Sequence, residues 1–414
     1  MNIREIQNKI AAPVGSINMN VEPKTFGYLL EGLGDLTSGV YFKSSDADNG
    51  DIAVGDTIDN GSSGTGTVAA IIAEEDIIIA TGVSGDWATS DTIGNSGTHS
   101  STLQTFDATI FAHLIQFPDE MDNSWSLQKN FTDRAIRYMG VKFHAVDSFA
   151  QSDNILTASV KLMARSAFRH ARVGTALTSG SGSKVIAVDQ TQGLVAGDSI
   201  KVYRPGTGFI DFSASAVKTH TIDSIVADTS VTVTLTQANI NVGDLIMLAP
   251  ITPSYTVDEE FAWIGNSQVA IGVDKDNLTS FDAQDYTMVL TQGLEERHAA
   301  SGTNIQNRMP TDLLQTGFTA SGSFKLHNEN EDYYRSLRLN TAQSVRLTTT
   351  GNQIASTGIN FQLIVTYTEV QFDQYQTSIA TDEIINEEVP FTSFYNATAG
   401  FSVQIILVND IATY

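Results

Sequence analysis

The sequence predicts a mainly β protein with short flanking helices, and both its composition and its hydrophobic pattern predict this. Only 17% of the residues are charged, whereas about 25% is typical of soluble domains. Ser, Thr, Asn, Gln and 32 glycines take the place of the missing charge. Hydrophobic residues make up 41% of the chain. In many segments they alternate with polar residues, as in strands that have one buried and one solvent-facing side.

The first 104 residues are predicted to hold a short N-terminal helix or arm and then a small β module. Ile3, Ile6 and Ile10 recur at helical spacing, and Pro13 would end such a helix. Residues 33–104 consist mainly of Gly, Ser, Thr and Asp around short aliphatic runs. This composition favours short strands joined by tight turns.

The next segment, residues 105–172, is predicted to combine strands with short helices. Thr132 is a good N-cap and Gly140 a good helix stop, so we expect one or two helical turns between them. A second helix is expected around Arg165 and Phe168. Strands are expected where apolar residues alternate, at 106–112, 125–127 and 156–162.

The rest of the chain is predicted to form a second Gly-rich β module, residues 173–249, and a strand-rich segment, residues 250–414. Early acids and a late Arg335 predict a helix over residues 329–337. Strand patterns cover 268–273, 286–290, 318–326, 344–348, 359–372 and 401–408. We therefore expect one core half in residues 1–32 and 105–172, another in 250–414, and two small modules inserted at 33–104 and 173–249.

Two internal repeats support this division. A Gly-Asp or Ser-Asp turn followed by an apolar alternation occurs twice in each Gly-rich segment, at Gly55-Asp56, Ser90-Asp91, Gly197-Asp198 and Gly243-Asp244. A longer repeat relates Leu156-Thr157-Ala158-Ser159 to Phe318-Thr319-Ala320-Ser321. The first repeat predicts two related β modules, and the second predicts a duplicated core.

The sequence contains no motif that indicates catalysis, a cofactor or a metal, so we predict a protein that is not an enzyme and has no cofactor. The chain has no cysteine, which excludes disulfides and thiolate metal sites. Residues 180–184 lack the spacing of a phosphate-binding loop, and residues 46–57 lack the Gly and Glu of a calcium-binding loop. A formal net charge of -24 argues against a surface that grips DNA or an anionic membrane.

Cations concentrate in the middle of this acidic chain, at Lys129, Arg134, Arg137, Lys142, Lys161, Arg165, Arg169 and Arg172. Acids elsewhere on the same chain would complement them, so one interpretation is an interface between identical subunits. A solvated face with local salt bridges is the other.

Segments of the chain resemble the tail tube proteins of long-tailed bacteriophages. The early resemblance lies in NSWSLQKNFTD at 123–133 and RYMGVKF at 137–143. The later resemblance lies in GFTASGSFKL at 317–326, in the acidic helix and in the closing strands. It covers residues 105–172 and 250–414 and leaves out the Gly-rich modules, which we interpret as decorations on the outer wall of a tube.

The resemblance implies a β-sandwich core flanked by short helices, and subunits that close into rings which stack into a tail tube. Genome DNA would pass through the lumen without specific binding, and an acidic lumen would repel its phosphates. The partners would be further copies of this chain, as a pseudo-hexameric trimer or a hexamer, and other tail proteins, with no membrane contact. The protein would be made in the host cytoplasm and reside in the virion. The expected subunit interface comprises Trp125, Phe131, Arg134, Arg137, Arg165, Arg169, Tyr333 and Tyr334.

The main alternative is a surface or virion β-protein that acts as an adhesin, a glycan-binding module or a decoration module. The richness in Thr, Asn and Gly equally permits this class of protein. It predicts exposed aromatic residues clustered on one face, whereas Trp87, Trp125 and Trp263 are scattered along the chain.

Overall fold

The computed structural model describes most of the chain as one large antiparallel sheet, which confirms the predicted mainly β class. Helical structure in the described residues is limited to α1 (Phe26–Glu31) and the 3-10 turn η1 (Ala73–Glu75). The described residues are 14–32, 34–47, 52–95, 98–117, 124–152, 155–177, 182–210, 219–235, 240–252, 260–262, 265–281, 283–298, 310–327, 342–373, 376–378 and 386–414.

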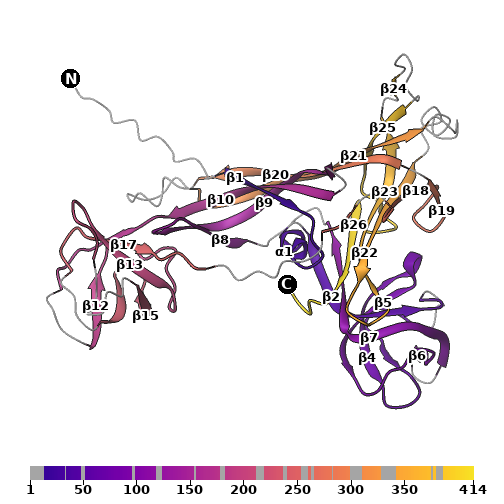
Figure 1. The fold of residues 1–414 in the computed structure, drawn as a ribbon, viewed down its shortest axis with the longest axis horizontal. Helices are drawn as coiled ribbons and strands as arrows, with labels where there is room; N and C mark the ends of the chain where they lie inside the picture. Colours follow the sequence, from indigo (N-terminus) through magenta and orange to yellow (C-terminus); the bar gives the residue numbers. More distant parts are fainter. Residues whose placement is uncertain are drawn as a thin grey trace.

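Long strands form an arm that extends across Figure 1, in the order β1-β10-β9-β20-β21-β25. β8 pairs with the first part of β9, beside the stretch that pairs with β20, and β24 pairs with β25. The strands are β1 (Val14–Asn20), β8 (Trp125–Asn130), β9 (Ala135–Ser152), β10 (Ile155–Phe168), β20 (Ala283–Arg297), β21 (Asp312–His327), β24 (Gln376–Ser378) and β25 (Asn386–Ser393).

A second group of strands continues the sheet through β23 (Asn360–Phe372), which pairs with β25, β22 and β26. β18 pairs with β22 and β19, while β26 pairs with β7, and β7 pairs with β2. The strands are β2 (Asp35–Ser44), β7 (Thr98–Gln116), β18 (Ser267–Gly272), β19 (Leu278–Phe281), β22 (Gln343–Gln353) and β26 (Val403–Asn409).

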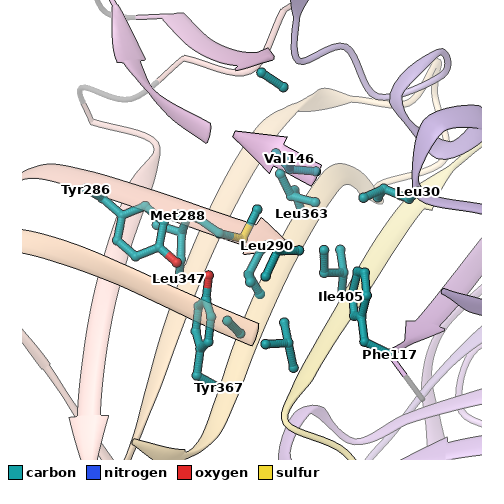
Figure 2. Packing of buried hydrophobic residues seen from close by; sticks show 14 of the residues in the cluster. Leu30, Phe117, Val146, Tyr286, Met288, Leu290, Leu347, Leu363, Tyr367 and Ile405 are labelled. Atoms are coloured by element: carbon teal, nitrogen blue, oxygen red, sulfur yellow. The ribbon is translucent and has the colours of Figure 1, made fainter. Parts of the chain in front are cut away.

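The main hydrophobic core lies where the arm covers this second group of strands. Figure 2 shows side chains of β20 facing those of β22, β23 and β26. Tyr286 of β20 and Tyr367 of β23 are both buried there, and burial raises the pKa of each phenol. Phe26 and Leu30, one helical turn apart on α1, bury their side chains in the same cluster.

The repeated Thr-Ala-Ser motifs occupy equivalent places on either side of the β9–β20 pair. Ala158 on β10 pairs with Phe149 of β9, and Ala320 on β21 pairs with Leu290 of β20. Both alanines are buried. β1 lies outside β10 as β25 lies outside β21, so the arm has an approximate two-fold arrangement about its centre.

The strands of residues 35–105 pair in a closed circuit, which we name barrel A. The circuit runs β2-β5-β4-β3-β6-β7 and returns to β2. Its interior is a hydrophobic cluster that includes Phe42, Ile58 and Ile93, each fully buried. The strands not yet given are β3 (Thr57–Asp59), β4 (Thr65–Ile72), β5 (Ile77–Ser84) and β6 (Thr92–Asn95).

The strands of residues 171–248 pair in a second closed circuit, which we name barrel B. The circuit runs β11-β17-β13-β15-β16-β12, and the bridge between Val173 and Val188 closes it. In Figure 1 barrel B lies at the left end of the arm and barrel A at the lower right. The strands are β11 (Ala171–Arg172), β12 (Gly182–Ala187), β13 (Ser199–Arg204), β14 (Gly208–Phe209), β15 (His220–Val226), β16 (Ser230–Leu235) and β17 (Leu245–Leu248).

The two barrels have the same pattern of strand pairing but begin it at different strands. The strand that comes last in barrel A, β7, corresponds to the strand that comes first in barrel B, β11. β12, β13, β15, β16 and β17 pair with one another as β2, β3, β4, β5 and β6 do, and β11 takes the place of β7. Barrel B is therefore a circular permutation of barrel A in its strand order.

The Gly-Asp and Ser-Asp turns have the same hydrogen bonds in both barrels. In each turn the aspartate carboxylate accepts from the backbone N–H three residues earlier, over 2.7–2.9 Å. The residue before each aspartate has a positive φ of 79–93°, a region that favours glycine. The turns precede equivalent strands and are centred on Asp56, Asp91, Asp198 and Asp244.

Four predictions about helices need correction or comment. The helix expected between Thr132 and Gly140 is wrong, because a tight turn ends at Arg134 and β9 begins at Ala135. The helix expected around Arg165 and Phe168 is also wrong, because β10 continues to Phe168 with alternating burial. The N-terminal helix and the helix at 329–337 lie outside the described residues.

Candidate assembly surfaces and buried polar sites

A buried histidine links three distant parts of the core. His113 on β7 has no exposed surface, and its Nε2 donates to Asn409 Oδ1 over 3.1 Å. Its Nδ1 then accepts from the Ser38 hydroxyl over 2.8 Å. Burial lowers the pKa of His113, because the charged imidazolium would lose its hydration. The neutral ring satisfies both of its nitrogens here.

The hydrogen bond between Ser38 and His113 is of the kind that activates a serine nucleophile in an enzyme. In this chain, however, the pair is part of the packed core. Such a nucleophile needs an open side from which a substrate can approach. His113 is fully enclosed, and the ring of Tyr414 covers it with centroids 4.6 Å apart. Its two partners lie 75 and 296 positions away in sequence, so no local motif announces the cluster.

Two ion pairs fasten the η1 turn of barrel A to the second group of strands. Glu75 accepts from Arg346 Nη1 of β22 over 2.8 Å, and Glu74 accepts from Lys275 Nζ over 3.1 Å. Arg346 also donates to the backbone oxygen of Lys275 over 2.8 Å. Burial raises the pKa of Glu75 even though the Arg346 charge opposes that shift. The sequence suggests only a charged turn at this position.

Arg137, expected at a subunit interface, lies in a joint within the chain. Its guanidinium contacts both carboxylate oxygens of Asp198 in barrel B, over 2.7 Å each. It also donates to the Gly193 carbonyl and to Gln128 Oε1, over 3.1 Å each. The side chains of the ion pair are 13% and 9% exposed. Arg137 therefore attaches barrel B to the arm.

The other residues expected at the interface are spread over the arm. Phe131 and Arg134 are exposed on the turn between β8 and β9, where Lys129 Nζ lies 5.7 Å from the centre of the Phe131 ring. Arg165 on β10 and Arg169 just beyond it are exposed, whereas Trp125 is half-buried against the main core. Tyr333 and Tyr334 lie outside the described residues.

In the part of the arm formed by β1, β10, β9 and β8, the described residues leave two strand edges unpaired and one apolar face partly open. Within the described residues β1 pairs with β10 alone, and β8 pairs with β9 alone. These two strands are the walls of an apolar groove of about 370 Å³. Leu162, Ala164 and Val141 line it from β10 and β9. The alternation of β10 predicts the buried side of this sheet, but the groove depends on strands far apart in sequence.

The described residues contain no cluster of His, Cys, Asp or Glu that could hold a metal ion. None of the helices among them is both long enough and apolar enough to span a membrane. The chain matches no protein-family model and no curated protein.

Proposed function

We propose that this chain is a structural virion protein whose copies close into rings, and that the rings stack into the tail tube through which a long-tailed bacteriophage delivers its DNA. The observation that carries this proposal is the arm, a long antiparallel sheet whose edge strands β1 and β8 have unpaired outer sides within the described residues. Open strand edges invite pairing with another chain. A ring of copies covers every such edge.

The charge of the chain supports the same proposal. A net charge of -24 gives a conduit that repels phosphate, so DNA slides through it without adhering. This role requires no covalent chemistry and no cofactor.

The approximate two-fold arrangement of the arm supports a duplicated core. Ala158 and Ala320 sit at equivalent places about the β9–β20 pair. If each half fills one position around the lumen, three chains make a ring with pseudo-sixfold symmetry. If the whole chain fills one position, six chains make it. Barrels A and B would then decorate the outer wall.

Negative-stain electron microscopy of the concentrated protein tests the proposal. The expected result is rings or stacked tubes with a central channel, and the symmetry of the averaged ring separates three chains from six. Particles that remain single at every concentration, with sedimentation velocity showing a monomer throughout, would count against ring assembly.

A further inference from the structure

Two apolar side chains are exposed on neighbouring segments, where the β8–β9 turn meets the residues that follow β17. Phe131 in the turn is 40% exposed, and Ile251 is 55% exposed. Asn130, next to Phe131, joins the two segments. Its Nδ2 donates to the Ile251 carbonyl over 2.8 Å, and its Oδ1 accepts from the Ile251 N–H over 3.3 Å. The apolar pair therefore lies on backbone that hydrogen bonds hold in place.

Cations surround these apolar side chains. Arg134 is exposed at the end of the turn, where its carbonyl accepts from the Phe131 N–H over 2.7 Å. Lys129 Nζ lies 5.7 Å from the centre of the Phe131 ring, and Lys201 Nζ donates to the Asp133 carbonyl over 3.1 Å. Aromatic residues and arginine are enriched in the contacts between proteins. We name Lys129, Phe131, Arg134, Lys201 and Ile251 the turn patch.

In three of the four Gly-Asp and Ser-Asp turns, the carboxylate that caps the turn also binds a side chain from elsewhere in the chain. The pairs are Asn60–Asp91 at 2.7 Å, Arg137–Asp198 at 2.7 Å and Arg204–Asp244 at 2.8 and 3.0 Å. Asp56 in barrel A caps its turn in the same way. Among the described residues, however, no side chain donates to its carboxylate. Val54, at the tip of this turn, is 65% exposed.

The Arg137–Asp198 pair shows how a cation of the arm holds such a turn. Arg137 binds both oxygens of Asp198 while the same carboxylate caps its own turn. A two-pronged pair of this kind adds geometric specificity as well as energy. Arg134, three residues earlier, is exposed, and in the part of the chain that the structure describes its guanidinium has no acceptor. One turn carboxylate thus lacks a side-chain donor, and one arginine near the joint lacks a carboxylate.

The charges of barrel A and of the turn patch are opposite. Residues 35–105, which form barrel A, contain eleven acidic residues and one cation, Lys43. Two of these acids, Glu74 and Glu75, already pair with cations of the second group of strands. The turn patch holds three cations, and the β8–β9 turn adds one acid, Asp133. Complementary charge of this kind directs the encounter of two surfaces and fixes their register.

We propose that the Asp56 turn of one copy docks on the turn patch of a neighbouring copy, with Val54 against Phe131 and Ile251 and the Asp56 carboxylate accepting from Arg134. This inference rests on the proposed ring assembly and names a contact that builds it. Barrel A lies at the lower right of Figure 1, whereas β8 and β13 lie to the left, so the contact joins two copies head-to-tail. A head-to-tail contact propagates from copy to copy and closes when the rotation permits. Barrel A then joins neighbouring copies along the outer wall.

Disulfide trapping tests the contact directly, because the chain has no cysteine of its own. The double variant V54C/I251C places one cysteine on the Asp56 turn and one in the turn patch. The matched control is V54C/V185C, since Val185 on β12 is 59% exposed and lies outside the patch. Under mild oxidation we expect covalent multimers from V54C/I251C and monomers from the control.

Two single variants, each with a matched control, test the charged and the apolar part of the contact. R134E reverses the cation that would bind Asp56, and its control R297E makes the same change at an exposed arginine of β20. F131S removes the aromatic side chain, and its control F394S changes a phenylalanine that is 47% exposed elsewhere. We expect R134E and F131S each to need at least about tenfold more protein for assembly, while both controls assemble as the natural chain does. All four side chains are exposed, so the melting temperature of the monomer should stay unchanged.

The outcomes separate this inference from the proposed function. Rings without V54C/I251C multimers, or rings that form equally well from R134E and F131S, overturn the inference and leave the ring proposal standing. A natural chain that forms neither rings nor other multimers overturns both.

Discussion

Arg137 on β9 and Asp198 in the turn before β13 form a two-pronged ion pair with both N–O distances at 2.7 Å. The same aspartate also accepts from the Val195 N–H over 2.7 Å. One carboxylate thus shapes a turn inside barrel B and holds the barrel on the arm. The equivalent Asp56 in barrel A shapes its turn in the same way, and no ion pair of Asp56 is found within the described residues.

Asp198→Asn should therefore cost more stability than Asp56→Asn. The first change leaves a mostly buried Arg137 charge without its carboxylate, a loss of about 3 kcal/mol. The second weakens one turn hydrogen bond, a loss of about 1 kcal/mol. Hydrogen exchange of the strand amides in each barrel measures both losses. Equal losses would mean that the Arg137 pair adds nothing to the turn.

The stability of the core should fall as the pH drops below about 6.5, because of His113. The pKa of His113 is lowered in the folded chain, so as the pH falls the unfolded chain takes up a proton before the folded chain does. This protonation favours the unfolded state. The stability that the neutral ring contributes is present above the unfolded pKa and is lost as the pH falls towards the folded one.

Urea unfolding at several pH values measures this dependence. His113→Gln should make the curve flatter between pH 7 and pH 5, at the expense of lower stability at pH 7. The control is His170→Gln, which changes an exposed histidine. A curve unchanged by H113Q would assign the acid sensitivity to another group.

Removing both partners of the Glu75–Arg346 pair should cost less than removing either one. Glu75→Gln leaves Arg346, whose side chain is only 11% exposed, without its ion pair. Arg346→Met leaves the Glu75 carboxylate without its ion pair, with Lys43 as the remaining cation that acts on it. Each single change should cost about 3 kcal/mol, whereas E75Q/R346M should recover most of that loss. A double-mutant cycle of unfolding free energies measures the coupling, and purely additive losses would rule it out.

The pH dependence of this pair has the opposite sign to that of His113. The folded pKa of Glu75 is raised, so the folded chain binds the proton more readily. Its contribution to stability grows as the pH falls through the raised pKa. Arg346→Met should raise that pKa further, which a carboxyl titration by NMR would detect.

Gly27 on α1 should tolerate alanine only when Tyr414 is removed. A Cβ at Gly27 would lie 2.0 Å from Cζ of the Tyr414 ring, so Gly27→Ala should displace that ring from His113 and destabilise the chain. In a Tyr414→Ala background the same change should stabilise α1 by about 1 kcal/mol, the usual helix preference for alanine over glycine. Thermal melts of the four variants show whether the sign reverses.

Ser90→Gly should stabilise barrel A. Ser90 has a φ of 79°, at a turn position where Gly55, Gly197 and Gly243 stand in the other three turns. A side chain in this backbone region costs about 1 kcal/mol, which glycine would return. Gly243→Ala should cost barrel B a similar amount. Hydrogen exchange of each barrel reports both changes, and a loss of stability in S90G would mean that the serine side chain compensates for its strain.

The period of the apolar residues predicted the strands because each strand has one buried side. The predicted segments 286–290 and 318–326 lie within the longer strands β20 and β21, and the segment 268–273 overlaps β18. The helix predicted between Thr132 and Gly140 is wrong, because that prediction relies on a good N-cap residue and a good helix-stop residue and disregards the alternation of apolar residues in β9. Around Phe168 the strand continues because its side chain completes the core of barrel B, a contact that local sequence does not encode.

The candidate sites were less predictable than the strands, since each depends on residues far apart in the chain. The cluster of cations favours either a subunit interface or a face with local salt bridges, and Arg137, which pairs within its own chain, fits the second interpretation. The groove joins β1 to β8 across more than a hundred residues.

The closed pairing of the barrels sets the order in which the chain can fold during synthesis. Barrel A needs no residue beyond β7, and barrel B needs none beyond β17. By contrast, residues 111–116 of β7 gain their β26 neighbour, and residues 145–150 of β9 their β20 neighbour, only when those later strands emerge. Contacts close in sequence form soonest. Both barrels would therefore fold during synthesis while the sheet that joins them is still incomplete. A defect in the late strands should then leave folded barrels on a chain that is prone to aggregate.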